Sequence, residues 1–398
     1  MDYIIKRKEA GDVEKEKSWL LVYGRRKTGK TFLLRNFCRL DGYFLVKRDL
    51  SIFSDEKQIT LGEMSKAVKE LLNRGKRVAI DEFQRLDESF LEEFTLLHPK
   101  GKLVISGSSM RIVKKFFEPR SALLGFFTPM KIGFISPMDV LSELKEKFTP
   151  AEAIELATFV REPWLIPLFG GENITEFVYK VVTKSKVIIS SLIGEVFGEE
   201  ERELSKKYEA ILSLIGSGVW NTKEIASIMY SRRLIPDPSV TNILQYIKNL
   251  EEMGLLEGIK IFNSKSNFYR LSSPIMNIYY YLESRYNISN REVSLEEVKP
   301  TLERLINLEI QNFIADFFAE KNNGRKEYYM SPQKEFDFVI TRRNRLEIVG
   351  EVKWKKVEAQ DVEKFRKNTE DLSGRKVIIF KHGKLKESMN AEEILSDL

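Results

Sequence analysis

The chain has 398 residues, of which 42% are hydrophobic and 31% are charged, so we expect several domains with apolar cores. Its formal net charge of +6 favours an acidic partner such as nucleic acid. One cysteine and two histidines exclude an internal disulfide and a multi-cysteine zinc site, and disfavour a Ser-His triad. Chemistry is therefore left to carboxylates, lysines, hydroxyls and a hard cation such as Mg²⁺.

Residues 1–148 alternate short apolar strands with helical stretches, which predicts a parallel α/β sheet. The expected strands are WLLVYG (19–24), YFLVKRDL (43–50), RVAIDEF (77–83), KLVISGSS (102–109) and MKIGFIS (130–136). No signal-peptide core opens the chain, and no apolar run approaches the roughly 18 residues of a membrane span. We therefore expect a cytoplasmic protein without a membrane partner.

The rest of the chain predicts three further modules. Residues 149–200 are typical of a helical lid, and 201–286 of a winged helix-turn-helix with a trailing helix. After a charged linker (287–300), residues 301–390 indicate another αβ domain. Its expected helix lies at 301–320, and its expected strands lie near 336–340, 346–354 and 376–381.

The segment GRRKTGKT (24–31) fits the spacing G-x-x-x-x-G-K-[ST] between a predicted strand and a predicted helix. Backbone N–H groups of such a loop wrap phosphates, a lysine meets the β- and γ-phosphates, and a hydroxyl takes Mg²⁺. The sequence therefore predicts an ATP site with Mg²⁺ at Thr31. The predicted nucleotide-binding residues of this loop are Gly24, Lys27, Thr28, Gly29, Lys30 and Thr31.

Asp81 and Glu82 end the apolar strand that follows the loop, which is the position of a Walker B pair. We expect Asp81 to hold Mg²⁺ and Glu82 to polarise the attacking water. The next predicted strand ends in ISGSS (105–109), where either Ser108 or Ser109 is the candidate sensor of the γ-phosphate. We take Ser108 as the binding residue.

A second group of charged residues lies on two strands near the C-terminus. Alternation predicts that Phe336 and Phe338 share one face, and that Asp337 faces the other way with Val339. A tight turn then brings Asp337 beside Glu351 and Lys353. Two carboxylates and a lysine are typical of a site that binds Mg²⁺ and activates water for phosphodiester cleavage. Glu309, on the preceding helix, is a further candidate metal ligand.

GRRKTGKT, AIDEFQRL (79–86) and LVISGSSM (103–110) together resemble the archaeal STAND-class ATPases, and IKRKE (5–9) resembles their R-x-x-E lead-in near the adenine. Two departures concern arginine and the lid. Phe126 stands where the resemblance implies an arginine, so we expect slow or trigger-dependent hydrolysis. Arg161-Glu162-Pro163 replaces Gly-x-Pro. The candidate substitutes for the missing arginine are Arg111, Arg120 and Arg161.

Residues 301–382 resemble the PD-(D/E)xK nuclease superfamily through EFD and GEVKW, and more specifically they resemble the nuclease-like domain often found downstream of archaeal STAND ATPases. The resemblance implies active-site places for Glu309, Asp337, Glu351 and Lys353. We expect a nucleotide-regulated, Mg²⁺-dependent nuclease acting on nucleic acid, with DNA favoured, and with nucleotide-dependent self-association open. The alternatives are a nucleotide-dependent DNA- or protein-binding switch without nuclease activity, and an ATPase whose C-terminal domain only binds.

The predicted winged helix has two interpretations. Its presumed recognition helix, 238–254, exposes residue types that suit base edges and phosphates, namely Ser239, Thr241, Asn242, Gln245 and Lys248. We expect Lys260, Lys265 and Arg270 in or beside the wing. The same module also serves as an internal packing element in STAND-like proteins, so the sequence leaves DNA contact and internal packing open.

Overall fold

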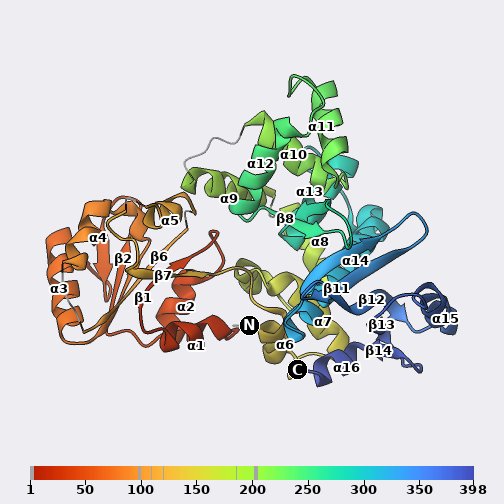
Figure 1. Ribbon diagram of the computed structural model, residues 1–398, viewed down its shortest axis with the longest axis horizontal. Helices are drawn as coiled ribbons and strands as arrows, with labels where there is room; N and C mark the ends of the chain where they lie inside the picture. The colour runs from red at the N-terminus through yellow and green to blue at the C-terminus, as the bar shows by residue number, and fades with distance from the viewer. Residues whose placement is uncertain (1–3, 97–99, 109, 120, 185, 201–204) are drawn as a thin grey trace. The chain divides into compact units, whose positions relative to one another are not determined.

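The computed structural model describes residues 4–96, 100–108, 110–119, 121–184, 186–200 and 205–398, which fold into two units (Figure 1). The P-loop unit comprises Lys6–Phe134 and Gly194–Glu203. The larger unit comprises Met1–Ile5, Ile135–Ile193 and Leu204–Leu398. Among the described residues, no helix has both the length and the apolarity needed to span a membrane.

The P-loop unit is built on a seven-stranded sheet with the order β4-β3-β2-β5-β6-β1-β7. The neighbours from β2 to β7 pair in parallel, whereas β3 and β4 add an antiparallel edge. The strand before the loop, β1, and the strand that ends at Asp81, β5, are separated by β6. The strands are β1 (Trp19–Tyr23), β2 (Gly42–Val46), β3 (Ile52–Ser54), β4 (Lys57–Ile59), β5 (Arg77–Asp81), β6 (Lys102–Gly107) and β7 (Phe127–Lys131).

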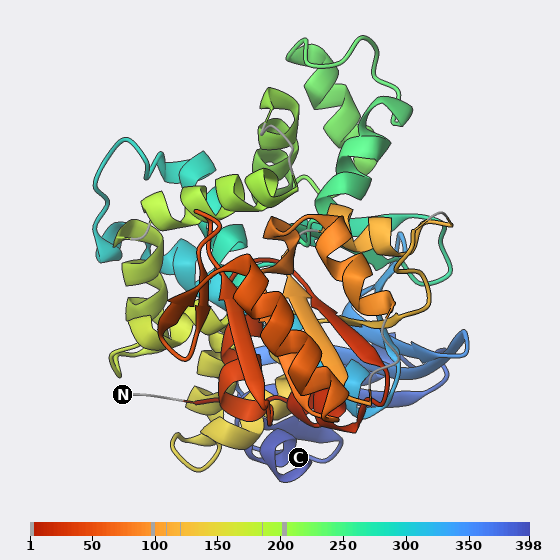
Figure 2. The ribbon, with the colours of Figure 1, turned by 90° about the vertical axis from the view of Figure 1, so that its left-hand side faces the viewer.

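Helices cover both faces of this sheet, because successive side chains of a strand point to opposite sides. Leu21 packs in the core with α3, α4 and α5, whereas its neighbours Leu20 and Val22 pack in the core with α1 and α2. In Figure 2, α3 lies in front of the strands. The helices are α1 (Lys8–Lys15), α2 (Lys30–Phe37), α3 (Leu61–Asn73), α4 (Glu88–Thr95) and α5 (Met110–Phe116), with a 3₁₀ turn η1 (Phe83–Arg85).

Two of the expected strands were wrongly bounded. The strand expected at 43–50 ends at Val46, and the chain then turns back as the β3–β4 hairpin. The strand expected at 130–136 is β7, which begins at Phe127. It contains Pro129, which lacks an N–H, and it is an edge strand that pairs only with β1 among the described strands. Pro129 therefore indicates that β7 is an edge strand, and it does not mark a strand boundary.

The larger unit begins with helices and continues into a hairpin. The elements are α6 (Pro137–Leu144), α7 (Pro150–Val160), η2 (Pro163–Leu168), α8 (Ile174–Lys184), α9 (Lys186–Glu199), α10 (Lys206–Gly216), α11 (Thr222–Ser231), α12 (Thr241–Glu252), β8 (Leu256–Lys260), β9 (Asn267–Leu271) and α13 (Pro274–Tyr286). Helix α9 crosses into the P-loop unit at Gly194. The three helices and the antiparallel β8–β9 hairpin follow in the order expected from the sequence.

A five-stranded sheet, β10-β11-β12-β13-β14, completes the larger unit, and α14 packs against β11 and β12. The elements are α14 (Leu295–Lys321), β10 (Arg325–Met330), β11 (Glu335–Arg342), β12 (Arg345–Lys356), α15 (Ala359–Asn368), β13 (Arg375–His382), β14 (Ser388–Asn390) and α16 (Ala391–Ser396). Part of the expected linker is helical, because α14 starts at Leu295 with the Ser294 side chain as its N-cap. Pro300 lies inside this helix without ending it.

Partly buried ion pairs join distant parts of the larger unit. Asp316 of α14 accepts from Arg161 at 2.7 Å and pairs with Lys326 of β10 at 2.6 Å. Lys326 also pairs with Glu257 of the hairpin at 3.1 Å. The charges of Lys326 and Arg161 hold the pKa of Asp316 well below its usual range although burial acts the other way. The lid segment, the hairpin and the C-terminal sheet therefore share one set of charges.

Candidate functional site

The predicted phosphate loop connects β1 to α2, which begins at Lys30. The backbone of Gly24 passes so close to Ile132 that a Cβ built on it would lie 2.0 Å from the Ile132 carbonyl oxygen. Gly29, the N-cap of α2, has a left-handed φ of 86°. The Lys30 ammonium donates to the Gly24 carbonyl at 2.7 Å and to the Arg25 carbonyl at 3.1 Å. The loop therefore curls around the lysine.

Lys27 and Thr28 also belong to the predicted phosphate loop. Lys27 has a left-handed φ of 65°, and it lines a cavity of about 680 Å³ together with Gly29, Lys30 and Thr31. Thr28 is buried, and its hydroxyl donates to the Arg25 carbonyl at 2.8 Å. Arg7, from the predicted lead-in, donates to the Thr28 carbonyl at 2.6 Å and pairs with Glu9 at 2.9 Å. Arg7 of the lead-in therefore fixes the backbone of the loop at Thr28.

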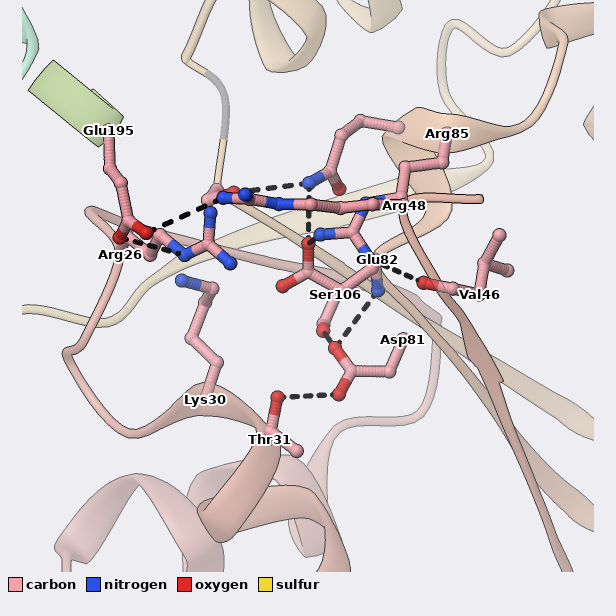
Figure 3. Close-up of polar contacts among 12 residues, drawn as sticks. Arg26, Lys30, Thr31, Val46, Arg48, Asp81, Glu82, Arg85, Ser106 and Glu195 are labelled. Carbon is pink, nitrogen blue, oxygen red and sulfur yellow. Dashed lines mark hydrogen bonds and ion pairs between the residues drawn. The ribbon is translucent and has the colours of Figure 1, made fainter. Parts of the chain in front are cut away.

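Asp81 is fully buried at the end of β5 and accepts hydrogen bonds from three neighbouring segments, and Figure 3 shows those from Thr31 and Ser106. Thr31 Oγ1 donates to Asp81 at 2.7 Å and Tyr43 Oη donates at 2.6 Å, while Ser106 Oγ donates to the other carboxylate oxygen. Burial and the Asp81 charge raise the pKa of the Tyr43 hydroxyl. The oxygens of Thr31 and Asp81 lie together and are of the kind that Mg²⁺ prefers, so these residues fit the ion.

Glu82 begins η1 in a left-handed conformation, with φ of 61°. Its carboxylate pairs with Arg85 at 2.6 Å and accepts from Gln84 Nε2 at 3.0 Å. Gln84 Nε2 also donates to Ser108 Oγ at 3.1 Å, and Arg85 donates to the Val46 carbonyl at 2.6 Å. Glu82, the predicted base, and Ser108, the predicted sensor, are therefore joined through the side-chain amide of Gln84. Ser109, the alternative sensor, lies outside the described residues.

The candidate arginines give no clear substitute for the residue expected at position 126. Phe126 is 40% exposed, with its ring 6.1 Å from that of Trp19. Arg120 and the side chain of Arg111 lie outside the part of the chain that the structure describes. Arg161 donates to the Ile135 carbonyl at 2.9 Å and pairs with Asp316, so it serves the interior of the larger unit.

At the C-terminus, the structure brings Asp337, Glu351 and Lys353 together. The described ladder between β11 and β12 ends at the pair Phe338–Gly350, and beyond it Val352 N donates to the Asp337 carboxylate at 2.7 Å. Lys353 Nζ lies 2.6 Å from Glu351 Oε1. Burial raises the pKa of Asp337 to about 6, and the Glu351 charge adds to this, while the Val352 hydrogen bond and the Lys353 charge oppose it. The pKa of Lys353 is also raised; burial lowers it, but its hydrogen bond and ion pair with Glu351 outweigh this.

The expected alternation along this strand fails at Phe336. Phe338 stacks on Phe318 of α14, with ring centroids 5.7 Å apart, whereas Phe336 packs with Phe365 of α15 and with Val339. The prediction that both phenylalanines share one face was therefore wrong. The neighbouring pairing with β10 shifts register between Glu327 and Tyr329, and such an irregularity changes the direction of side chains.

Glu309 lies apart from the arrangement expected of it. It is buried on α14 and pairs with Arg270 of β9. Burial raises the pKa of Glu309, and the Arg270 charge acts against this. Within the described ranges, no group of three or more His, Cys, Asp or Glu side chains is arranged to hold a metal ion. Asp337 and Glu351 offer oxygen ligands. Glu309 does not join them in such a group, because its carboxylate forms an ion pair with Arg270.

The hairpin and α12 differ in part from the expected DNA-reading face. Arg270 lies in the β9 strand of the hairpin, as expected, but it is only 9% exposed and pairs with Glu309, so it does not contribute to an exposed basic face. On α12, Asn242 donates to Asp237 at 3.0 Å and Gln245 donates to Asn249 at 2.8 Å. Thr241, Gln245 and Lys248 are exposed. Ser239 is exposed as well, so four of the five residues predicted on this face are accessible, and the face is less basic than expected because Arg270 is buried.

Sequence reasoning missed several residues around the phosphate loop. Tyr43 and Ser106 contact Asp81 because β2 and β6 flank β5 in the sheet. Gln84 lies three residues beyond Asp81, and its position in AIDEFQRL was the only available signal. Glu195, on α9, lines the cavity together with Lys30 and Glu82, and no local motif marks it.

The family match lies within the P-loop unit, whereas the similar solved structures cover most of the chain. Residues 16–132 match the family model described as "AAA domain". No curated protein matches the chain. Among solved structures, the chain is similar to the ORC2 protein of Aeropyrum pernix in ADPNP and ADP complexes (12% identity, 79% of this chain and 97% of that chain, TM-score 0.40). It is also similar to the A. pernix ORC1 protein in complex with DNA (16%, 71% and 91%, 0.26).

A third such structure is that of Cdc6p from Pyrobaculum aerophilum (12% identity, 75% of this chain and 91% of that chain, TM-score 0.26). These TM-scores are too low to indicate the activity or the partners of this chain. The family match covers residues 16–132, and this segment contains both the phosphate loop and the buried Asp81 at the end of β5. By these features, residues 16–132 are similar to the P-loop ATPases of the AAA type.

Proposed function

We propose that the chain is a nucleotide-regulated enzyme. Its P-loop unit binds and hydrolyses ATP, and residues 301–390 act as a PD-(D/E)xK nuclease-like domain on nucleic acid, with DNA favoured. The observation that carries the ATP part is the meeting of Thr31 and Asp81, whose oxygens lie 2.7 Å apart beside Lys30 and Glu82. The match of residues 16–132 to the AAA domain supports it.

Each residue of the loop has a distinct role in this proposal. The backbone of Lys27, Thr28 and Gly29 donates to phosphate oxygens, and Lys30 neutralises the β- and γ-phosphates. Thr31 and Asp81 would hold Mg²⁺, which supplies positive charge to the phosphates when it is bound. Glu82 polarises the attacking water, and Arg85 and Gln84 fix its carboxylate until then.

The nuclease part rests on the cluster of Asp337, Glu351 and Lys353. A carboxyl pKa raised to about 6 beside a second carboxylate is typical of a working site, because burial and a like charge are costly to keep in a fold. Asp337 and Glu351 would hold Mg²⁺, and Lys353, which stays charged because its pKa is raised, would orient a water. The helices and hairpin of 201–286, read as a winged helix, and the net charge of +6 support nucleic acid as the substrate.

One observation favours a second candidate function. Glu309 is paired with Arg270 and does not complete a three-ligand metal site. In this alternative the chain is a STAND-type switch whose ATP and ADP states differ in binding to DNA, to a protein or to a second copy, without cleavage. The two candidates share the ATP site and differ at Asp337.

The test uses the full chain with plasmid, linear and single-stranded substrates, with Mg²⁺ or Mn²⁺ and with or without ATP. We expect wild type to bind and hydrolyse ATP and to cut a substrate in a nucleotide-dependent way. Lys30→Ala should lose ATP binding, and Asp337→Ala should lose cleavage while keeping ATP affinity. Glu370→Ala, an exposed carboxylate after α15, is the matched control. Cleavage that survives Asp337→Ala contradicts the assigned site, whereas nucleotide-dependent binding without any cleavage favours the switch.

A further inference from the structure

A carboxylate lies between two guanidinium groups beside the phosphate loop. Glu195 Oε2 is 3.4 Å from Arg26 Nε, and Glu195 Oε1 is 3.5 Å from Arg48 Nη2. The three residues come from the phosphate loop, from the turn after β2 and from α9, and all of them belong to the P-loop unit. Figure 3 shows both arginines reaching Glu195 near the Lys30 side chain.

This arrangement lies at the place where a phosphate of ATP is expected. Arg26 and Glu195 line the same cavity of about 680 Å³ as Lys30, Thr31 and Glu82. A guanidinium binds phosphate and carboxylate oxygens with the same planar pair of N–H groups. A negative side chain that faces two arginines at the mouth of a phosphate site thus has the charge and the hydrogen-bonding pattern of the ligand itself.

The ion pairs of Glu195 with Arg26 and Arg48 can be replaced by contacts of the two arginines with a phosphate group. The side chains of Arg26, Glu195 and Arg48 are 24%, 33% and 65% exposed, so water screens these ion pairs and they contribute little to stability. A phosphate group carries more negative charge than one carboxylate and offers more oxygens to the same donors. ATP can therefore displace Glu195 from the arginines at small cost to the fold.

We propose that Arg26 and Arg48 bind the terminal phosphate of ATP, and that Glu195 is the counter-ion that they release when ATP binds. This inference rests on the proposed ATP site and deepens it. It gives the phosphate site two arginines of its own, although Phe126 stands where one was expected. It also links the nucleotide to α9, whose residues up to Ile193 belong to the larger unit.

The test is equilibrium binding of fluorescent ATP and ADP analogues to the full chain. Arg48→Ala should weaken ATP binding about tenfold and change ADP binding less than about twofold, because only ATP carries the terminal phosphate. Glu195→Gln should act in the opposite direction and tighten ATP binding by about threefold to tenfold, because the Glu195 carboxylate then no longer competes with the phosphate for the two arginines. Arg74→Ala, an exposed arginine after α3, is the matched control and should change neither affinity.

Failure of this inference is distinguishable from failure of the proposed function. If Lys30→Ala abolishes ATP binding but Arg48→Ala and Glu195→Gln leave the ratio of ATP to ADP affinity unchanged, the arginine assignment is overturned and the ATP site stands. If Lys30→Ala leaves ATP affinity intact, both are overturned. Arg48→Lys separates charge from geometry, and it should retain part of the preference for ATP. Circular dichroism of each variant shows whether the fold is intact.

Discussion

Arg270 of β9 and Glu309 of α14 form a buried ion pair between the hairpin and the C-terminal domain. Burial works against the charged form of each, and each charge favours the other. The pair is balanced only while both partners are present, because a single charge left in the interior is costly. The presumed metal ligand of the sequence is therefore a structural residue that binds two segments together.

Replacing one partner should reveal this dependence. We expect Arg270→Ala to lower the free energy of unfolding by about 3–5 kcal/mol, because Glu309 is then buried without compensation. The double variant Arg270→Met with Glu309→Leu should recover most of that loss. Urea unfolding followed by tryptophan fluorescence measures both. A loss below about 1 kcal/mol in the single variant would contradict the buried pair.

Asp337 should make stability depend on pH. Its pKa is about 6 in the folded chain against an ordinary value of 3.8, so the folded state binds this proton more tightly than the unfolded state. The stability that this group contributes is fully present below the ordinary pKa and is lost as the pH rises through about 6. Asp337→Asn keeps an oxygen acceptor for Val352 N and carries no charge.

We therefore expect Asp337→Asn to raise the free energy of unfolding at pH 8 by up to about 3 kcal/mol and to bring no gain at pH 4. The measurement is a series of denaturant titrations across this range. Asp371→Asn is the control, because Asp371 is exposed beside Lys334 and its pKa is lowered. A gain that does not vary with pH would show that charge is not its cause.

Gly24 should not tolerate a side chain. A Cβ there would lie 2.0 Å from the Ile132 carbonyl oxygen, a backbone atom that cannot move aside alone. We expect Gly24→Ala to displace the loop and to weaken ATP binding more than about tenfold. Gly62→Ala is the control, because a Cβ at Gly62 of α3 meets nothing within 4 Å, and alanine favours a helix. Nucleotide titration of both variants decides the matter, and equal affinities would refute the clash.

Tyr43 should support the charge on Asp81. Its hydroxyl donates at 2.6 Å to the carboxylate of Asp81, which is fully buried. We expect Tyr43→Phe to cost about 1–3 kcal/mol of stability, because a buried carboxylate then loses one donor. Tyr23→Phe, on β1, should cost less. Thermal unfolding compares the two, and an equal cost for both would show that the hydroxyl of Tyr43 plays no special part.

The sequence predicted those features that depend on local spacing. Lys30 and Thr31 follow from a fixed loop length, and Asp81 from its place at the end of an apolar strand. Asp337 lies near Glu351 and Lys353 because β11 and β12 are antiparallel neighbours joined by a short turn. The strands and helices themselves follow from the periodicity of apolar residues.

Features that depend on tertiary arrangement were not predictable. Tyr43 and Ser106 contact Asp81 only because the strand order makes β2 and β6 the neighbours of β5. Glu309 and Arg270 are far apart in the sequence, and each alone reads as an exposed charge. Phe336 changes face beside an irregular register, which no alternation pattern records.

The charges shared among Arg161, Asp316, Lys326 and Glu257 limit how the larger unit can be divided. A fragment cut before α14 would retain Asp316 and Lys326 but lose Arg161 and Glu257. It would also expose the inner face of α14 to water. We therefore expect that the segment from α14 to the C-terminus does not fold when it is expressed alone. Proteases should degrade the larger unit in a single step rather than release a durable C-terminal core.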